Sequence, residues 1–402
     1  MNRPRLAFIA PRYCATSAGG AEVYCQLLAE KVAALGYAVD VLTTCANDHT
    51  TWKNHFKPGE EFINGVKVRR FEVDSDRKLE SFYSIQNRIS NRQPMTPQEE
   101  LTWIQGSVRS QALEQHIERN HTQYDFLIFI PYLFGTTYWG AKLFPEKTIL
   151  IPCLHDEPFA YLSIFKEMFQ SVKGLMFNTV AERELAKKLY ELDDAKCAVV
   201  SLGFEEGKRV GPALFRKKFK IEEPYILFAG RREKGKNVPL LMECFRAYKR
   251  HNPNHLKLVL IGSGPVELLP EDKENIFDFG YVSEEEKLSA TEGALVFCQP
   301  STNESLSIVI LQAWLFEVPV LVHSHCAVTK AHCDGSNGGL YFKNYFEFEE
   351  CLNFFLNNPA IVKKMGESGR QYVQQFFNWN SVLKRFQSAL EKFQSSSLAL
   401  HS

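Results

Sequence analysis

The chain has 402 residues, which is more than one hydrophobic core normally organises, so we expect two sizeable domains. Hydrophobic residues make up 45% of the chain, with 23 Gly and 18 Pro, and this composition excludes a disordered or collagen-like protein. Lys plus Arg and Asp plus Glu both total 47. Because no net charge attracts a polyanion, we expect no nucleic-acid partner.

The first apolar run, Leu6–Ala10, is too short for a secretory signal or a membrane span. Ten cysteines, several of them inside apolar runs, are typical of small buried side chains in a reducing compartment. We therefore expect a cytoplasmic protein. Peripheral contact with the inner membrane surface stays open, although no basic amphipathic helix is evident near the N-terminus.

Short apolar runs alternate with longer helical patterns along nearly the whole chain, which is typical of parallel α/β proteins. In the first half we expect strands at Leu6–Ala10, Ala38–Thr43, Phe126–Ile130, Thr148–Leu154, Gly174–Asn178 and Cys197–Ser201. In the second half we expect them at Tyr225–Ala229, Lys257–Ile261, Ile276–Phe279, Ala294–Gln299 and Val320–His323. Two strand series in succession predict two doubly wound domains.

The predicted boundaries follow changes in composition. We expect a first domain over 1–205, a polar linker over 206–224, a second domain over 225–378, and a C-terminal helix with a loose Ser-rich tail over 379–402. Packing of that helix on the first domain is an open alternative. An irregular insertion over about 74–123 interrupts the first domain. Its apolar positions predict a helix over a sheet edge, and they are Leu101, Ile104, Val108, Ala112 and Leu113.

The strongest candidate site is YILFAGRREKGKN, residues 225–237, where a buried strand ends in Gly230 and is followed by Arg231 and Lys236. Two cations at the carboxyl end of a parallel strand are well placed for a diphosphate, because ligands of open α/β sheets bind at that edge. A solvated basic turn is the alternative.

The second candidate is LVFCQPSTNESLSIVILQ, residues 295–312, in which a buried strand leads through Pro300 and Ser301 to Glu304 and an apolar helix. We expect Glu304 at the helix N-terminus, among unpaired N–H groups suited to a phosphate or a sugar hydroxyl. An ordinary capping carboxylate is the alternative.

The order of these segments, with IGSG at 261–264 and GYVS at 280–283 between them, resembles the nucleotide-sugar domain of retaining glycosyltransferases of family 4. The resemblance covers most of the chain and implies the GT-B fold, two facing Rossmann-like domains with parallel sheets and a cleft between them. It implies that Arg231 and Lys236 hold the donor diphosphate and that Glu304 matches the first Glu of the family's Glu–seven residues–Glu motif. Here the second position is Gln312, and Ser305, Leu306 and Ser307 replace the family's Gly-Phe-Gly.

The first domain offers a glycine pair, Gly19 and Gly20, after its first strand, and His155 after the predicted strand at 148–154. A tight turn is the alternative for the glycines, and the resemblance implies that His155 contacts the donor sugar rather than acting as a base. We read FNTVAERELA, residues 177–186, as structural, with Thr179 as N-cap and Glu182 in a capping box. The resemblance also implies substrate or nucleotide contacts at Gly19, Gly20, Gly230, Gly262, Tyr281, Val282, Ser305, Leu306, Ser307, Ile308 and Gln312.

We expect no metal and no redox cofactor. Five His and Cys side chains cluster within residues 323–333, but their spacing fits no common zinc pattern, and they are His323, His325, Cys326, His332 and Cys333. Asp74 to Asp76 reads as a solvated loop, and IGSG is only half of a dinucleotide-binding fingerprint.

The implied function is metal-independent, retaining transfer of a sugar from a UDP-sugar or GDP-sugar to a hydroxyl of a glycan, lipid-linked saccharide or small polyol, as in polysaccharide biosynthesis. Gln312 can make only part of the ribose pairing that a carboxylate makes, and this departure keeps two alternatives open. One is a non-catalytic GT-B binding or scaffold subunit, and the other is a nucleotide-sugar 2-epimerase. The donor base, the acceptor and the oligomeric state stay open.

Overall fold

A computed structural model describes residues 3–14, 19–75, 79–207, 209–232 and 234–398. The chain divides into two compact units, each with its own sheet and core. The first unit is Met1–Gly203 together with Trp379–Ser402, and the second is Phe204–Asn378. Within the described residues, no helix is long and apolar enough to cross a membrane.

The first unit contains an eight-stranded sheet in the order β3-β4-β2-β1-β5-β6-β7-β8. Its strands are β1 (Leu6–Ala10), β2 (Val39–Thr44), β3 (Gly59–Ile63), β4 (Val66–Phe71), β5 (Phe126–Phe129), β6 (Thr148–Leu150), β7 (Gly174–Phe177) and β8 (Cys197–Val199). The pairings are parallel except that of β3 with β4. Strands β1 and β5 are fully buried and apolar, because helices cover the sheet.

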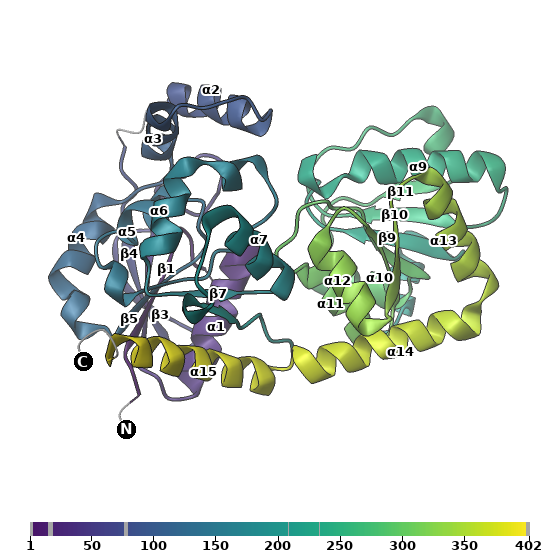
Figure 1. The fold of residues 1–402 in the computed structure, drawn as a ribbon. Coiled ribbons are helices and arrows are strands. Elements are labelled where there is room, and N and C mark those ends of the chain that lie inside the picture. Colours follow the sequence, from purple (N-terminus) through teal and green to yellow (C-terminus); the bar gives the residue numbers. More distant parts are fainter. Residues whose placement is uncertain (1–2, 15–18, 76–78, 208, 233, 399–402) are drawn as a thin grey trace. The chain divides into compact units, whose positions relative to one another are not determined.

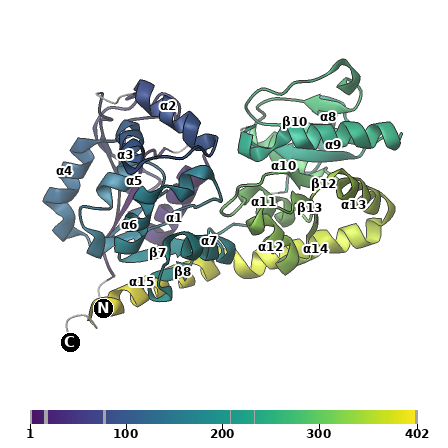
Figure 2. The same cartoon turned by 45° about the horizontal axis from the view of Figure 1, so that its top comes forward.

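The helices of the first unit are α1 (Gly20–Ala34), α2 (Leu79–Ser90), α3 (Pro97–Gly106), α4 (Gln111–Asn120), α5 (Gly135–Gly140), α6 (Ser163–Ser171), α7 (Val180–Tyr190) and α15 (Trp379–Leu398). Short 3-10 turns lie at His121–Gln123, Pro145–Lys147, Pro158–Tyr161 and Asp194–Lys196. Helix α15 follows the second unit in sequence but lies beside α1, as Figures 1 and 2 show. Phe386 of α15 stacks on Phe8 of β1 at 6.5 Å, and Arg385 donates to the Val200 carbonyl at 3.1 Å.

The loose Ser-rich tail that we predicted is wrong at its start, because α15 continues to Leu398. Phe393 is buried and packs on Gly174, where a side chain would collide with the ring. The Ser395 hydroxyl donates to the Glu391 carbonyl at 2.9 Å within the helix. The burial of Phe393 therefore stabilises the helix just before the serines, and the helix continues through them.

The single helix predicted from the apolar stripe at 101–113 is also wrong, because the segment breaks into α3 and α4. Ser107 ends α3 with an extended backbone, ψ 169°, and Gly106 packs against Phe82. Ser110 then caps α4 by accepting the Leu113 N–H at 3.3 Å. Serine side chains compete with helical hydrogen bonds, which explains the break.

The β3–β4 hairpin was not predicted, although its signal is in the sequence. Asn64 and Gly65 join the two strands with φ values of 50° and 82°. Asn-Gly between two strand-like segments is the strongest short-range hairpin signal. Because β3 carries exposed charged residues, its sequence does not alternate between apolar and polar residues, and the strand was not predicted.

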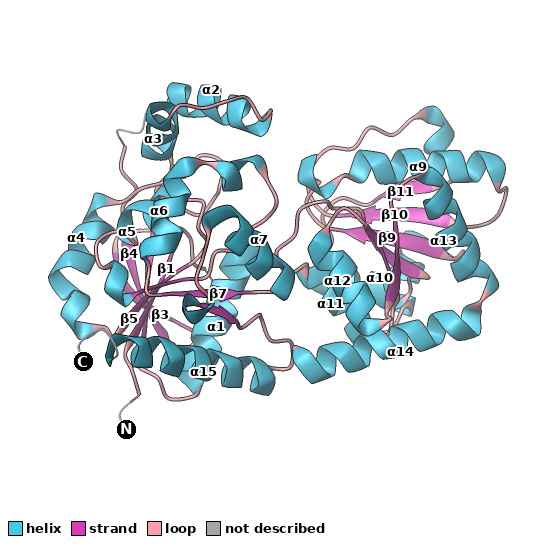
Figure 3. Cartoon of the chain, in the orientation of Figure 1, coloured by secondary structure: helices cyan, strands magenta, loops and turns pink. Residues whose placement is uncertain are grey.

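The second unit contains a six-stranded parallel sheet in the order β11-β10-β9-β12-β13-β14 (Figure 3). The strands are β9 (Tyr225–Ala229), β10 (Lys257–Ile261), β11 (Ile276–Asp278), β12 (Val296–Gln299), β13 (Val320–His323) and β14 (Gly339–Phe342). The helices are α8 (Ala213–Phe219), α9 (Val238–His251), α10 (Glu284–Glu292), α11 (Ile308–Leu315), α12 (Ala327–Ser336), α13 (Tyr345–Asn357) and α14 (Pro359–Phe376), with 3-10 turns at Lys234–Lys236 and Pro270–Asp272.

The predicted strands of both halves are present, with ends that differ by a few residues, whereas β14 was missed. Strand β6 ends at Leu150 rather than Leu154, because Pro152 has no N–H to donate and Cys153 adopts φ 52°. The segment 206–224, predicted as a linker, instead belongs to the second unit. Its helix α8 buries Phe215 completely and packs against α10.

Candidate functional site

Three loops meet at the carboxyl edge of the second unit's sheet, and we call residues 230–232, 262–264 and 278–281 the three-loop edge. The Gly230 N–H donates to the Ile261 carbonyl at 3.0 Å, and the Gly262 N–H donates to the Gly280 carbonyl at 2.7 Å. Gly262 has φ 124°, and a Cβ there would collide with the carbonyl oxygen of Gly230. Glycine is therefore required where these loops pass each other.

The first loop carries two adjacent arginines, Arg231 and Arg232. The side chain of Arg232 is buried and forms a two-pronged ion pair with Asp278, with Nη1 at 3.0 Å from Oδ2. Arg231 is half-buried at the same edge. The carboxylate of Asp278 holds Arg232, and Arg231 is the arginine of this loop that the sequence predicts for an anionic ligand.

Lys236 and Glu304, predicted from separate motifs, lie together. Lys236 Nζ is 2.7 Å from Glu304 Oε1, and the Gln299 amide donates to the same oxygen at 3.0 Å. The Glu304 side chain is only 9% exposed. Gln299 was not predicted, although a buried polar residue that ends an apolar strand is a signal of function.

Glu304 does not lie at the helix N-terminus as predicted, because α11 begins only at Ile308. Ser307 is its N-cap and adopts φ 63°, ψ 67°, a left-handed conformation that suits the Gly of the family motif. The buried ring of His332 forms a hydrogen bond with Leu306, with Nε2 at 3.1 Å from the Leu306 carbonyl oxygen. Burial lowers the pKa of His332 to about 4, so the ring is neutral and donates from Nε2.

The remaining predicted positions of this unit lie in α11, in the segment before it, and after β11. Ser305, Leu306 and Ser307 are buried, whereas Ile308 and Gln312 of α11 are half-buried. Tyr281 is 86% exposed after β11, and Val282 is half-buried beside it. An exposed ring at the three-loop edge offers a flat apolar surface to a ligand.

The predicted residues of the first unit lie at the carboxyl edge of its own sheet. Gly19 is the N-cap of α1, and a Cβ there would collide with the carboxylate of Glu22. Glu22 forms an ion pair with Arg12, whose Nη1 donates to the Asn47 carbonyl at 3.0 Å. The positive end of α1 is therefore already supplied with a carboxylate by the chain.

His155 is half-buried in the loop after β6, with Nδ1 3.9 Å from Glu157 Oε1. The loop is held by Glu182, which is buried and accepts the N–H groups of Leu154 and Asn178, both at 2.6 Å. Burial raises the pKa of Glu182 to about 8. Thr179 caps α7 as predicted, but Glu182 also joins two loops, so its role exceeds a capping box.

The His and Cys cluster does not converge. His323 Nδ1 accepts the His325 N–H at 3.2 Å, while His332 faces Leu306 and Tyr372. Over the residues that the structure describes, no three His, Cys, Asp or Glu side chains are placed to hold a metal ion. Asp74 is not simply solvated, because its carboxylate accepts the Gln111 N–H at 3.1 Å, and Asp76 lies outside the described residues.

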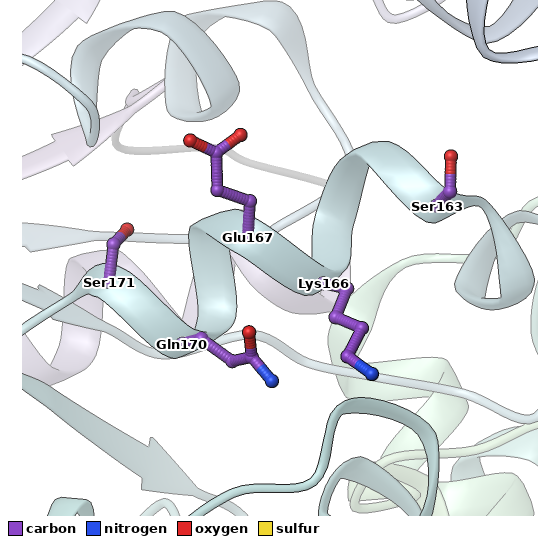
Figure 4. Close-up of a pocket in the computed structure, with 5 residues that line it drawn as sticks. All are labelled: Ser163, Lys166, Glu167, Gln170 and Ser171. Carbon is purple, nitrogen blue, oxygen red and sulfur yellow. The ribbon is translucent and has the colours of Figure 1, made fainter.

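A hollow of about 480 Å³ on α6 lies apart from these positions, and its lining residues are Ser163, Lys166, Glu167, Gln170 and Ser171. In Figure 4, Glu167 and Lys166 extend to opposite sides of the helix. Lys166 is paired with Glu191 at 2.8 Å. The side chains do not converge on a common point, and the hollow offers no built site.

Comparison with known families gives one match, in the second unit. Residues 213–372 match the family model described as Glycosyl transferases group 1. This stretch contains the three-loop edge, Lys236, Glu304 and Gln312. The chain therefore carries a group 1 glycosyltransferase domain.

Curated relatives and solved structures extend the similarity to the rest of the chain. D-inositol 3-phosphate glycosyltransferase of Streptomyces coelicolor is 22% identical over 91% of this chain and 85% of its own length. Sucrose-phosphate synthase from Thermosynechococcus elongatus superimposes with a TM-score of 0.71 at 16% identity, covering 98% of this chain and 100% of the other. Anabaena HepE in complex with UDP-glucose gives 0.68 at 12% identity, covering 98% and 100%. The fold is GT-B, as predicted, with one Rossmann-like sheet in each unit.

Proposed function

We propose that the chain is a retaining glycosyltransferase of family 4, which moves a sugar from a UDP-sugar or GDP-sugar to a hydroxyl acceptor without a metal ion. The observation that carries the proposal is the meeting of Lys236, Glu304 and Gln299 beside the edge that bears Arg231. Similarity supports the donor class, because the solved neighbour HepE binds UDP-glucose.

The proposed reaction breaks the bond between the anomeric carbon and the donor phosphate. Negative charge then grows on the leaving diphosphate, and the sugar gains oxocarbenium character. Arg231 and Lys236 hold that charge, each contact stabilising the transition state by about 2–3 kcal/mol. Fixed cations of the chain thus take the role that a metal ion takes elsewhere.

Glu304 and Gln299 orient the sugar. Glu304 Oε1 is committed to Lys236 and Gln299, so Oε2 is placed to accept a sugar hydroxyl. In the family's front-side course, the acceptor oxygen forms the new bond on the face that the phosphate leaves. The acceptor proton passes to the leaving phosphate oxygen, so that no side-chain nucleophile or base takes part.

We propose three classes of acceptor: a glycan, a lipid-linked saccharide or a small polyol. The names of two relatives contain phosphorylated compounds, D-inositol 3-phosphate and mannosylfructose-phosphate. Small phosphorylated polyols and sugars therefore come first in an acceptor screen.

Calorimetric titration with UDP and GDP, followed by a panel of sugar nucleotides, tests the proposal. We expect one nucleotide to bind and one donor to lose its sugar to water or to an acceptor. The double variant Arg231→Met/Lys236→Met should abolish binding, whereas the charge-matched control Arg250→Met/Lys363→Met should not. Failure of the wild-type chain to bind either nucleotide would refute the proposal and favour a scaffold role, and release of an epimerised sugar would indicate the epimerase.

A further inference from the structure

One ion pair of the second unit ties three separate loops. The Arg232 side chain is 3% exposed, and its two terminal nitrogens meet both carboxylate oxygens of Asp278, 46 residues away in sequence. Arg232 Nη1 also donates to the Gly264 carbonyl at 2.7 Å, and its backbone N–H donates to the Ser263 carbonyl at 2.8 Å. A single arginine therefore joins the loops after β9, β10 and β11.

Asp278 extends the same network to the last loop. Its Oδ1 accepts the Gly280 N–H at 2.9 Å, and the Gly280 carbonyl accepts the Gly262 N–H at 2.7 Å. These bonds close a ring around the three-loop edge. Arg231 directly precedes Arg232 in the sequence, and Tyr281 directly follows Gly280.

A pair of this kind does little for stability alone, because removing two charges from water offsets most of their attraction. What a planar, two-pronged Arg–carboxylate contact supplies is geometry, since it fixes both partners in distance and in plane. We propose that Arg232 and Asp278 are positioning residues for the nucleotide diphosphate of the donor: they hold the backbone that presents Arg231, Gly262 and Tyr281. This inference rests on the proposed function of the same edge.

The chain offers a matched control in the same unit. Arg246 and Asp272 form a second two-pronged pair, with Nε–Oδ1 at 2.8 Å and Nη2–Oδ2 at 2.6 Å. Arg246 also donates to a backbone carbonyl, that of Glu267, and Asp272 also accepts a backbone N–H, that of Leu269. This pair joins α9 to the turn at 270–272, which bears none of the predicted donor contacts.

The experiment compares Arg232→Met and Asp278→Asn with Arg246→Met and Asp272→Asn. Melting temperature, UDP and GDP affinity, and hydrogen exchange of the Gly262 and Gly280 amides are measured on the full chain. We expect both pairs of variants to lower the melting temperature, because each single substitution leaves the partner charge without its ion pair. Only those at Arg232 and Asp278 should speed exchange at the two glycines and weaken nucleotide binding, by about ten- to a hundredfold for a displacement near 1 Å.

If Arg232→Met does not fold, Arg232→Lys replaces it, because lysine keeps the charge but not the two-pronged contact. This variant should also speed exchange at the two glycines and weaken nucleotide binding, by smaller amounts. Equal nucleotide affinity in the two pairs of variants would overturn the inference, and so would unchanged exchange at the glycines. Absence of nucleotide binding by the wild-type chain is a different result. It refutes the proposed function and the donor role of the pair, while exchange still reports whether the pair holds the loops.

Discussion

Replacing Glu304 with Gln should move nucleotide affinity and turnover in opposite directions. The Glu304 carboxylate is 2.7 Å from Lys236 Nζ and would compete with a diphosphate for the same ammonium group. Gln keeps the shape and still accepts a hydrogen bond from the lysine, but it carries no charge. The variant should therefore bind UDP or GDP more tightly while it orients the sugar less well.

The size of the gain follows from the charge removed. A phosphate oxygen bonded to Lys236 lies about 4 Å from the carboxylate, where two unit charges repel by about 1 kcal/mol in bulk water and about 4 kcal/mol at an effective dielectric of 20. Glu304 is 9% exposed and Lys236 25%, so the site lies between these limits. Because Lys236 loses part of its ion pair in the variant, we expect the low end, about five- to tenfold tighter binding.

The assay measures dissociation constants for UDP and GDP by calorimetry at one salt concentration, and donor turnover under single-turnover conditions. Turnover should fall by about a hundredfold, the cost of a misplaced reacting group. The control Glu317→Gln removes one charge from another ion pair of the same unit, 2.7 Å from Arg370, and should change neither quantity. If Glu304→Gln instead weakens nucleotide binding, as Lys236→Met should, the carboxylate positions the lysine and the reasoning is refuted.

Three further outcomes concern stability. Gly262→Ala should cost about 1–3 kcal/mol more in chemical denaturation than Gly211→Ala, because both have positive φ but only the first collides with backbone; equal costs would contradict this. Above pH 8, where the Glu182 carboxylate is ionised, Glu182→Gln should cost about 1–3 kcal/mol, since an amide accepts only one of two buried N–H bonds. A loss no larger than that of exposed Glu184→Gln would refute it. Burial lowers the pKa of His332 to about 4 in the folded chain, so the unfolded chain takes up a proton between about pH 6.5 and 4 that the folded chain does not. As the pH falls through that range, the free energy of unfolding should decrease. His332→Gln should make this decrease smaller, and an unchanged pH dependence in the variant would contradict the lowered pKa of His332.

Much of the architecture was predictable because strand signals are local. Strands β1, β9, β10 and β13 have the predicted bounds to the residue, since each is a short, mainly apolar segment between polar turns. The placement of Arg231 at the carboxyl edge follows from its position directly after a parallel strand and Gly230. The hairpin at Asn64 and Gly65 was equally readable and was missed because its strands are short and charged.

The side-chain pairings of the site were not predictable in the same way. Lys236 and Glu304 are 68 residues apart and Arg232 and Asp278 are 46 apart, and no periodicity links such positions. Likewise, Glu182 resembles a first-turn cap until the loop bearing Leu154 is placed against it.

The sequence by itself therefore determined the two parallel sheets, the edge at which each presents its loops, and the residue types that stand there, because those depend on local periodicity and chain direction. Tertiary structure alone decided that Asp278 holds Arg232, where α11 begins, and that the last helix completes the first unit. These depend on contacts between distant segments, where burial makes each polar group find a partner.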